Sequence, residues 1–459
     1  MLSANQYQAR WYVSLFKEVD IAPLILFRIL FGFLLFCHCV QFMGKGINEY
    51  FVQPSFVFTS PGFTFLQGLR GEIMYYYFAA MAFFGLMIMV GLFYRFSMIA
   101  FTLLWQVAYL VQVANYNNHF YLILLLCYLM IFMPANQYCS MDVAFTPTIK
   151  TRSCPQWIYY LFIVQVMILY FYAGFNKLNA DWLSGAVYKT NAGFKKPFPF
   201  IGSLYFNPFF KYLIIWGGLI FDLLICPILL IKRFRRFGFI LACLFHLLNV
   251  YLFDIGIFPY LSIALFIFFF DPPEISKIFF NNKKTYLHSP LAPSHFVKRE
   301  WIVFTVGVYL LIQVLLPLRA YLYKGNTYWT EDGYRLSWRM MMRTKGGIVH
   351  FTVKDSAAKK TWVNVEKELT PSQQKILAIS PDMIWQFAQK LSKDYADKGF
   401  NVQVYASSWV RLNDHPAKPF VDSTTDLAKT KLNTFKSTKW ILPFHDDANN
   451  LPLTTRPHY

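Results

Sequence analysis

Long apolar runs separated by short polar segments dominate the first 318 residues. A membrane span needs about 20 mainly apolar residues. Nine runs approach or reach that length, at 22–43, 73–93, 97–114, 119–134, 157–175, 210–231, 236–253, 256–271 and 301–318. Those at 119–134 and 256–271 are short, so we expect them to be tilted, re-entrant or packed inside the bundle. The pattern predicts eight or nine spans, and the first is too long for a cleaved signal.

Composition and charge agree with a membrane protein. Of the 459 residues, 56% are hydrophobic, 20% are aromatic and only 15% are charged. With the N-terminus inside, the inner segments hold fourteen lysines and arginines and the short outer loops hold seven. Because positive charge accumulates on the inner side, this orientation is favoured, and nine spans would leave the C-terminus outside.

After Leu318 the composition becomes mixed and polar for about 140 residues, which is an ordinary domain size. Residues 347–354, 361–365 and 402–412 have strand patterns, and 372–391 has the period of an amphipathic helix. The last 30 residues have weak periodicity. We therefore expect a polytopic α-helical membrane bundle (1–318) followed by an exported α+β or β-sandwich-like domain (319–459).

Several chemistries have no motif in this chain. It contains no Walker loop, GxGxxG, HExxH or CxxC pattern, and none of its seven cysteines lies after residue 318. Nucleotide hydrolysis, zinc catalysis and a disulfide framework are therefore not expected, and neither a metal nor a nucleic-acid partner is predicted.

The polar groups inside the spans are few, and such groups are expensive unless they are paired or used. For Arg28 and Asp222 we favour an interhelical ion pair. His119 and His246 fit interhelical hydrogen bonding as well as they fit catalysis. With the orientation above, both histidines lie towards the outer surface together with Asn249.

Lys177 ends the apolar run 157–175, in the stretch 176–182 (NKLNADW). An amine at a membrane boundary can snorkel to the headgroups. Alternatively, it can lie in a water-poor pocket and accept a proton. Asp181 and Trp182 suit a helix cap and an interfacial anchor.

Residues 173–182 (AGFNKLNADW) also resemble the lysine-bearing segment of the vitamin K-dependent gamma-glutamyl carboxylases, a family with an HTTM domain. Six further segments resemble the family in the same order: FRILFG at 27–32, NNH at 117–119, FHLLN at 245–249, IGIFPY at 255–260, SWRMM at 337–341 and WVRLND at 409–414. The resemblance covers both predicted domains.

The resemblance implies an enzyme that oxygenates reduced vitamin K with O2 to an epoxide and couples this to proton removal and CO2 addition at a peptide glutamate. Lys177 would be the base that takes the hydroquinone proton, and His119 and His246 would complete the catalytic set. Asn118, His119, Lys177 and Asn249 would bind the cofactor, a phylloquinol or menaquinol, and Trp338 and Arg343 would bind substrate. The implied partners are a glutamate-containing peptide or protein, membrane lipid and the isoprenoid quinone.

Two departures from animal members favour a bacterial homologue. Arg343 replaces the usual histidine, and the exported segment is short and lacks cysteines. We therefore expect a bacterial inner membrane with the C-terminal domain periplasmic or extracellular, or an ER membrane with a lumenal domain if the source is eukaryotic. The exported segment has 21 Lys/Arg against 13 Asp/Glu, which suits an acidic partner or anionic lipid. The open alternatives are a quinol epoxidase without carboxylation and a non-enzymatic transporter or scaffold.

Overall fold

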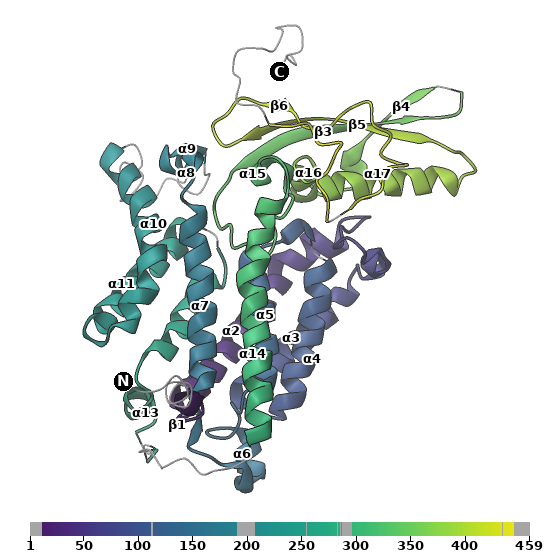
Figure 1. The fold of residues 1–459 in the computed structure, drawn as a ribbon. Helices are drawn as coiled ribbons and strands as arrows, with labels where there is room; N and C mark the ends of the chain where they lie inside the picture. The colour runs from purple at the N-terminus through teal and green to yellow at the C-terminus, as the bar shows by residue number, and fades with distance from the viewer. Residues whose placement is uncertain are drawn as a thin grey trace.

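A helical bundle with a small sheet domain across one end makes up the computed structural model (Figure 1). It describes residues 12–111, 113–190, 207–253, 255–281, 283, 284, 286, 296–357, 359–433 and 435–444. Of the last 30 residues, whose periodicity is weak, 430–433 and 435–444 are described, and Trp440 and Ile441 are buried there. Asp254, expected to end the seventh span, lies outside the described residues. The N-terminal end of the described chain and the sheet domain lie at opposite ends of the bundle.

Seven helices of the described chain are long and apolar enough to cross a membrane. They are α2 (Ala22–Ile47, extended by the π-helix η1, Asn48–Val52), α3 (Ile73–Val90), α4 (Tyr94–Val111), α7 (Trp157–Asn176), α10 (Pro208–Leu230), α11 (Lys232–Leu252) and α14 (Phe296–Leu318). A helix pair bent by 118° at 270–271 counts as an eighth span if taken together: α12 with η7 (Phe258–Phe269), and α13 (Pro272–Phe279). The predicted helical membrane bundle is confirmed.

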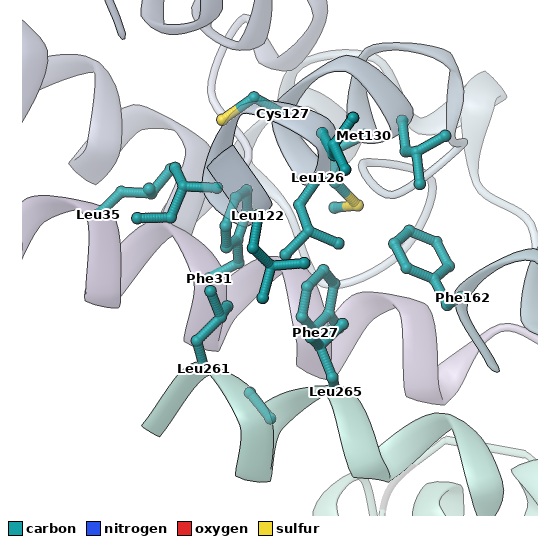
Figure 2. Close-up of a cluster of buried hydrophobic side chains, with 14 of the residues drawn as sticks. Phe27, Phe31, Leu35, Leu122, Leu126, Cys127, Met130, Phe162, Leu261 and Leu265 are labelled. Carbon is teal, nitrogen blue, oxygen red and sulfur yellow. The ribbon is translucent and has the colours of Figure 1, made fainter. Parts of the chain in front are cut away.

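The two short apolar runs form interior elements. The run at 119–134 is the 15-residue helix α5 (Asn118–Phe132), and the run at 256–271 supplies α12 and η7. Figure 2 shows Leu122 and Leu126 of α5 meeting Phe27 of α2 and Leu261 of α12. Because their neighbours cover them, α5 and α12 need not span the full hydrocarbon thickness.

Helix α14 differs from the interior helices because it lies at the margin of the bundle. Only 11% of the residues in its most apolar 18-residue stretch are buried. Tyr309 donates to Gln165 at 2.6 Å, and the carbonyl of Val314 accepts from Tyr172 at 2.6 Å. Gln313 accepts from Tyr121 at 3.1 Å. Polar contacts therefore attach this helix to the bundle.

Arg28 corrects one sequence interpretation. Its guanidinium donates to the carbonyl oxygens of Ala135 at 3.3 Å and Cys139 at 2.6 Å, in the turn after α5. Within the described chain it has no carboxylate in salt-bridge distance, so the ion-pair interpretation is wrong for Arg28. A guanidinium has several fixed donors, and the carbonyls of an irregular turn accept from both terminal nitrogens, while Nε has no hydrogen-bond partner within the described chain. Asp222 does form an interhelical ion pair, with Lys177.

The exported domain has one antiparallel sheet in the order β4-β3-β5-β6. Its strands are β3 (Lys345–Lys354), β4 (Lys360–Val363), β5 (Gln403–Leu412) and β6 (Lys418–Pro419). Residues 372–391 do not form one helix: α16 (Pro371–Leu377) and α17 (Pro381–Ala396) are separated at Pro381, whose ring disfavours a helical residue before it. Phe387 of α17 packs on Phe351 of β3 at 5.0 Å. Of the two folds expected, the arrangement is α+β.

The remaining elements are short. They are β1 (Glu18–Asp20), which pairs antiparallel with β2 (Ser153–Pro155), the helices α6 (Met141–Phe145), α8 (Ala180–Leu183), α9 (Ala186–Thr190) and α15 (Thr327–Thr330), and the 3₁₀ turns η2 (Thr64–Gly68), η3 (Val113–Asn115), η4 (Pro147–Ile149), η8 (Arg319–Leu322) and η9 (Val365–Lys367).

Helices α2 and α3 approach closely at Gly32, where an added methyl group would lie 2.6 Å from Met89 Cα. We expect Gly32→Ala to destabilise the protein by about 1–3 kcal/mol, because backbone must move to admit the methyl group. Gly44→Ala in the same helix is the control, since nothing lies within 4 Å of its added carbon. Unfolding in detergent measures both, and equal effects would contradict the packing assignment.

Candidate active site

Lys177 lies at the C-terminal end of α7, on the side of the exported domain. The backbone turns there, and the Asn179 side chain caps α8 by accepting from the Trp182 amide at 3.0 Å. This turn returns Trp182 towards α7, and the Lys177 Nζ lies 5.1 Å from its ring centre. Lys177 is only 6% exposed. The side chain is directed inward, so the geometry does not favour the snorkelling interpretation.

Asp222 of α10 receives that amine. Lys177 Nζ donates to Asp222 Oδ2 at 2.5 Å and to the Ala173 carbonyl at 3.3 Å. Asp222 is 7% exposed. Either charge alone would be strongly unfavourable in these surroundings. Together the amine and carboxyl form a dyad in which the shared proton resides on nitrogen or on oxygen.

His246 of α11 occupies a neighbouring aromatic enclosure. Its Nε2 lies 2.7 Å from the Tyr170 hydroxyl, and the residue is 1% exposed. The rings of Phe221 and Phe258 pack at 5.8 and 6.0 Å from the imidazole. Phe221 directly precedes Asp222 in α10, so the two buried polar pairs are adjacent. Within the described chain the Nδ1 atom of His246 is buried with no hydrogen-bond partner.

His119 is the second residue of α5 and approaches this enclosure through Phe258. The Phe258 ring centre lies 6.4 Å from that of His119 and 6.0 Å from that of His246. Gly256, with a positive φ of 58°, makes the turn beside His119. Asn249 is partly exposed and follows His246 by three residues, which places both on one face of α11. In the part of the chain described here, no hydrogen bond directly joins Lys177, His119 and His246.

Residues 334–343 of the exported domain, which we call the roof segment, cover the end of the bundle. Asn118 Nδ2 donates to the Arg339 carbonyl at 3.3 Å, and Asn176 Nδ2 donates to the Ser337 carbonyl at 3.0 Å. These asparagines directly precede His119 and Lys177 in the chain. Two of the three candidate catalytic residues, His119 and Lys177, are therefore next to a side chain that binds the roof segment.

The roof segment inserts Trp338 into the bundle core. Trp338 is fully buried, with its ring centre 5.0 Å from that of Tyr121 of α5. Its backbone has a positive φ of 54°, as do Leu336 at 61° and Met341 at 53°. Three non-glycine residues in this conformation indicate a segment held by its surroundings. Its indole nitrogen, like His246 Nδ1, has no hydrogen-bond partner within the described chain.

Arg343 already has an internal carboxylate partner. It donates to Glu331 at 2.8 Å and to the Tyr328 carbonyl at 3.1 Å, and its guanidinium lies 4.1 Å from the Tyr334 ring centre. Burial alone would raise the pKa of Glu331, but the charges of Arg343 and Lys345 lower it to about 2. Recognition of a substrate carboxylate by Arg343 stays a prediction, and it would require exchange with Glu331.

The sequence reasoning missed both internal partners, Asp222 for Lys177 and Glu331 for Arg343. The sequence did contain a signal that pointed to Asp222 as the partner of Lys177. Asp222 is the only charged residue between 212 and 230, in a strongly apolar helix, and Lys177 ends another. No comparable signal marked Glu331, because acidic residues are ordinary in a polar domain.

Comparison with protein families agrees with this layout. The family model of the HTTM domain matches residues 16–273, more than half of the chain. The model described as vitamin K-dependent gamma-carboxylase, lumenal domain, matches residues 298–447. The chain belongs to the vitamin K-dependent gamma-carboxylase family. The lumenal-domain match to this family member includes α14 as well as the sheet domain. No solved structure matches the chain.

The lowered pKa of Glu331 predicts that acid destabilises the C-terminal domain of this family member. Because the folded-state pKa of Glu331 is lowered, its stabilisation is complete above about pH 4.5 and is lost as the pH falls towards 2. Glu331→Gln should remove this pH dependence and destabilise the domain by about 3–5 kcal/mol, because Arg343 is left unpaired. Hydrogen exchange of β3 at pH 7 and pH 3 measures both effects. Exposed Glu366→Gln is the control, and the same exchange rates in both variants would contradict the assignment.

Proposed function

We propose that this protein is a peptidyl-glutamate carboxylase that couples oxygenation of a reduced quinone to carboxylation of a peptide glutamate. The observation that carries the proposal is the buried Lys177–Asp222 dyad at the exported end of the bundle, 2.5 Å between its charged atoms. Membership of the carboxylase family supports the same reaction class. A scaffold has no need for such a dyad beside the buried His246.

Two features of the described residues support binding of a hydroquinone. Its ring needs apolar walls, and the rings of Phe221 and Phe258 pack around His246. Its oxygens need hydrogen-bond partners, and the buried Nδ1 of His246 has none within the described chain. When bound, reduced vitamin K reacts with O2 and supplies the base strong enough for the glutamate γ-proton, after which CO2 adds at that carbon.

Lys177 would accept the hydroquinone proton, which requires a neutral amine. A carboxylate in contact favours the ammonium form of the lysine, so this role requires the proton of the dyad to reside on the Asp222 carboxyl oxygen before Lys177 accepts another. Asp222 then acts as a positioning residue that holds Nζ at the pocket edge. His119 and Asn118 would polarise the hydroquinone oxygens, and Asn249 would contact the cofactor from α11.

The glutamate substrate would approach from the exported side. The excess of positive charge after residue 318 attracts acidic segments. Trp338 and Arg343 belong to the roof segment or its end, so they would border the path between the exported domain and the dyad. We further propose that residues 1–318 are the quinone-reacting domain, that residues 319–459 receive the peptide, and that the protein resides in a bacterial inner membrane with the latter outside.

The test uses protein in lipid nanodiscs with vitamin K hydroquinone, O2, labelled bicarbonate and a glutamate-rich peptide. Wild type should form epoxide and fix label. Lys177→Ala should lose both products by about 10²–10⁴-fold, the usual contribution of a positioned base. Lys189→Ala is the control: Lys189 forms a surface pair with Asp414 on the same side of the bundle and is 58% exposed in its side chain.

The outcomes separate the alternatives. Epoxide without label in wild type would indicate a quinol epoxidase. No product from folded wild-type protein would contradict the enzyme proposal and favour a transporter or scaffold. Retained activity in Lys177→Ala would remove Lys177 from its proposed role even if carboxylation itself occurs.

A further inference from the structure

A small cavity lies among α2, α3, α4 and the beginning of α5, apart from the Lys177–Asp222 dyad. Six of its nine lining residues are aromatic: Phe42, Phe78, Trp105, Tyr109, Tyr116 and Phe120. Asn115 adds an amide to the wall. Ala108 of α4 contributes a small wall residue, and His38 of α2 contributes an imidazole. The cavity volume is about 30 Å³.

The volume decides which molecules fit. One water needs about 10–15 Å³ measured in this way, so the cavity admits about two waters or one molecule of two or three heavy atoms. Sites for drug-sized ligands are about 300–1,000 Å³. A naphthoquinone ring and a peptide side chain are therefore both too large.

Polarity separates water from an apolar gas. A buried water typically needs two to four polar partners. The Tyr116 hydroxyl already accepts from the Leu336 amide at 2.8 Å and donates to Asn118 at 3.3 Å. His38 Nδ1 is buried without a hydrogen-bond partner within the described chain. Six of the nine residues that line the cavity are aromatic, so its wall is mainly apolar and accommodates an uncharged gas well.

The cavity is one aromatic ring away from a candidate catalytic residue. The Phe120 ring centre lies 5.3 Å from that of His38 and 4.6 Å from that of His119. Phe120 thus separates the cavity from His119. A molecule held beside His38 is close to the place where His119 would contact the hydroquinone.

We propose that this cavity is a binding site for dioxygen. The inference rests on the proposed function, whose reaction consumes two uncharged gases. Of the two, O2 must meet the hydroquinone beside His119, whereas CO2 must meet the glutamate. O2 concentrates in the hydrocarbon of the membrane and enters aromatic cavities without losing hydrogen bonds. His38 supplies a polar contact from its buried Nδ1 atom.

Gas binding is tested first, without any catalytic readout. Xenon enters dry apolar cavities, so pressurised wild-type protein should show a xenon site bordered by His38 and Ala108 in its structure. Ala108→Leu should abolish this site by filling it, and Ala108→Val is the milder variant if the leucine protein does not fold. Ala80→Leu adds the same carbons to an exposed position of α3 and should retain the site. Raised O2 pressure should displace xenon from wild type.

Kinetics then test use of the site. In Ala108→Leu the O2 concentration giving half-maximal epoxide formation should rise about tenfold, equivalent to about 1.4 kcal/mol, with the hydroquinone dependence unchanged. Ala80→Leu should behave as wild type.

An unchanged O2 dependence would overturn the proposal, and so would an altered CO2 dependence with normal epoxide formation. A wild type that makes no epoxide would refute the proposed function, and O2 failing to displace xenon would refute the dioxygen site independently.

Discussion

The buried contact between Lys177 and Asp222 is the interaction on which the arrangement of the site depends. It joins the end of α7 to the middle of α10, in surroundings where neither charge is stable alone. Close packing of the two helices makes it possible. A methyl group added at Gly174 would lie 2.7 Å from the Leu223 side chain, so a glycine is needed for the approach. The same approach brings Phe221 against His246, which ties the histidine enclosure to the dyad.

The roof segment links this site to the exported domain through two asparagine amides. Asn118 and Asn176 bind backbone carbonyls, and each precedes a candidate catalytic residue. A movement of the roof segment would therefore act on His119 and Lys177 through single peptide units. The buried Trp338 adds a rigid contact to Tyr121 at the same place. The exported domain is in this sense part of the site and not an appendage.

The sequence predicts what local pattern determines and misses what depends on distant pairing. Hydrophobic runs placed the spans, and alternation placed β3 and β5 to within two residues. The periodicity of 372–391 did not reveal that this stretch forms two helices. Both helices present apolar residues to the same core, and proline is also common at the first position of a helix, where Pro381 lies. The partner of Lys177 is 45 residues away in the chain. Arg28 hydrogen-bonds to carbonyls of a turn that no sequence motif marks. The resemblance, and not the pattern, singled out His119 and His246 from other membrane histidines.

Helix α14 has a consequence for how the protein meets its membrane. Its lipid-facing side chains make few contacts, and polar contacts with α5 and α7 fix its position along the bundle. Together with the roof segment, these contacts hold the sheet domain at one position relative to the bundle. The apolar residues of this helix are free to vary with bilayer thickness. A homologue from a thicker or thinner membrane can change that surface extensively while the exported domain stays in register with the dyad.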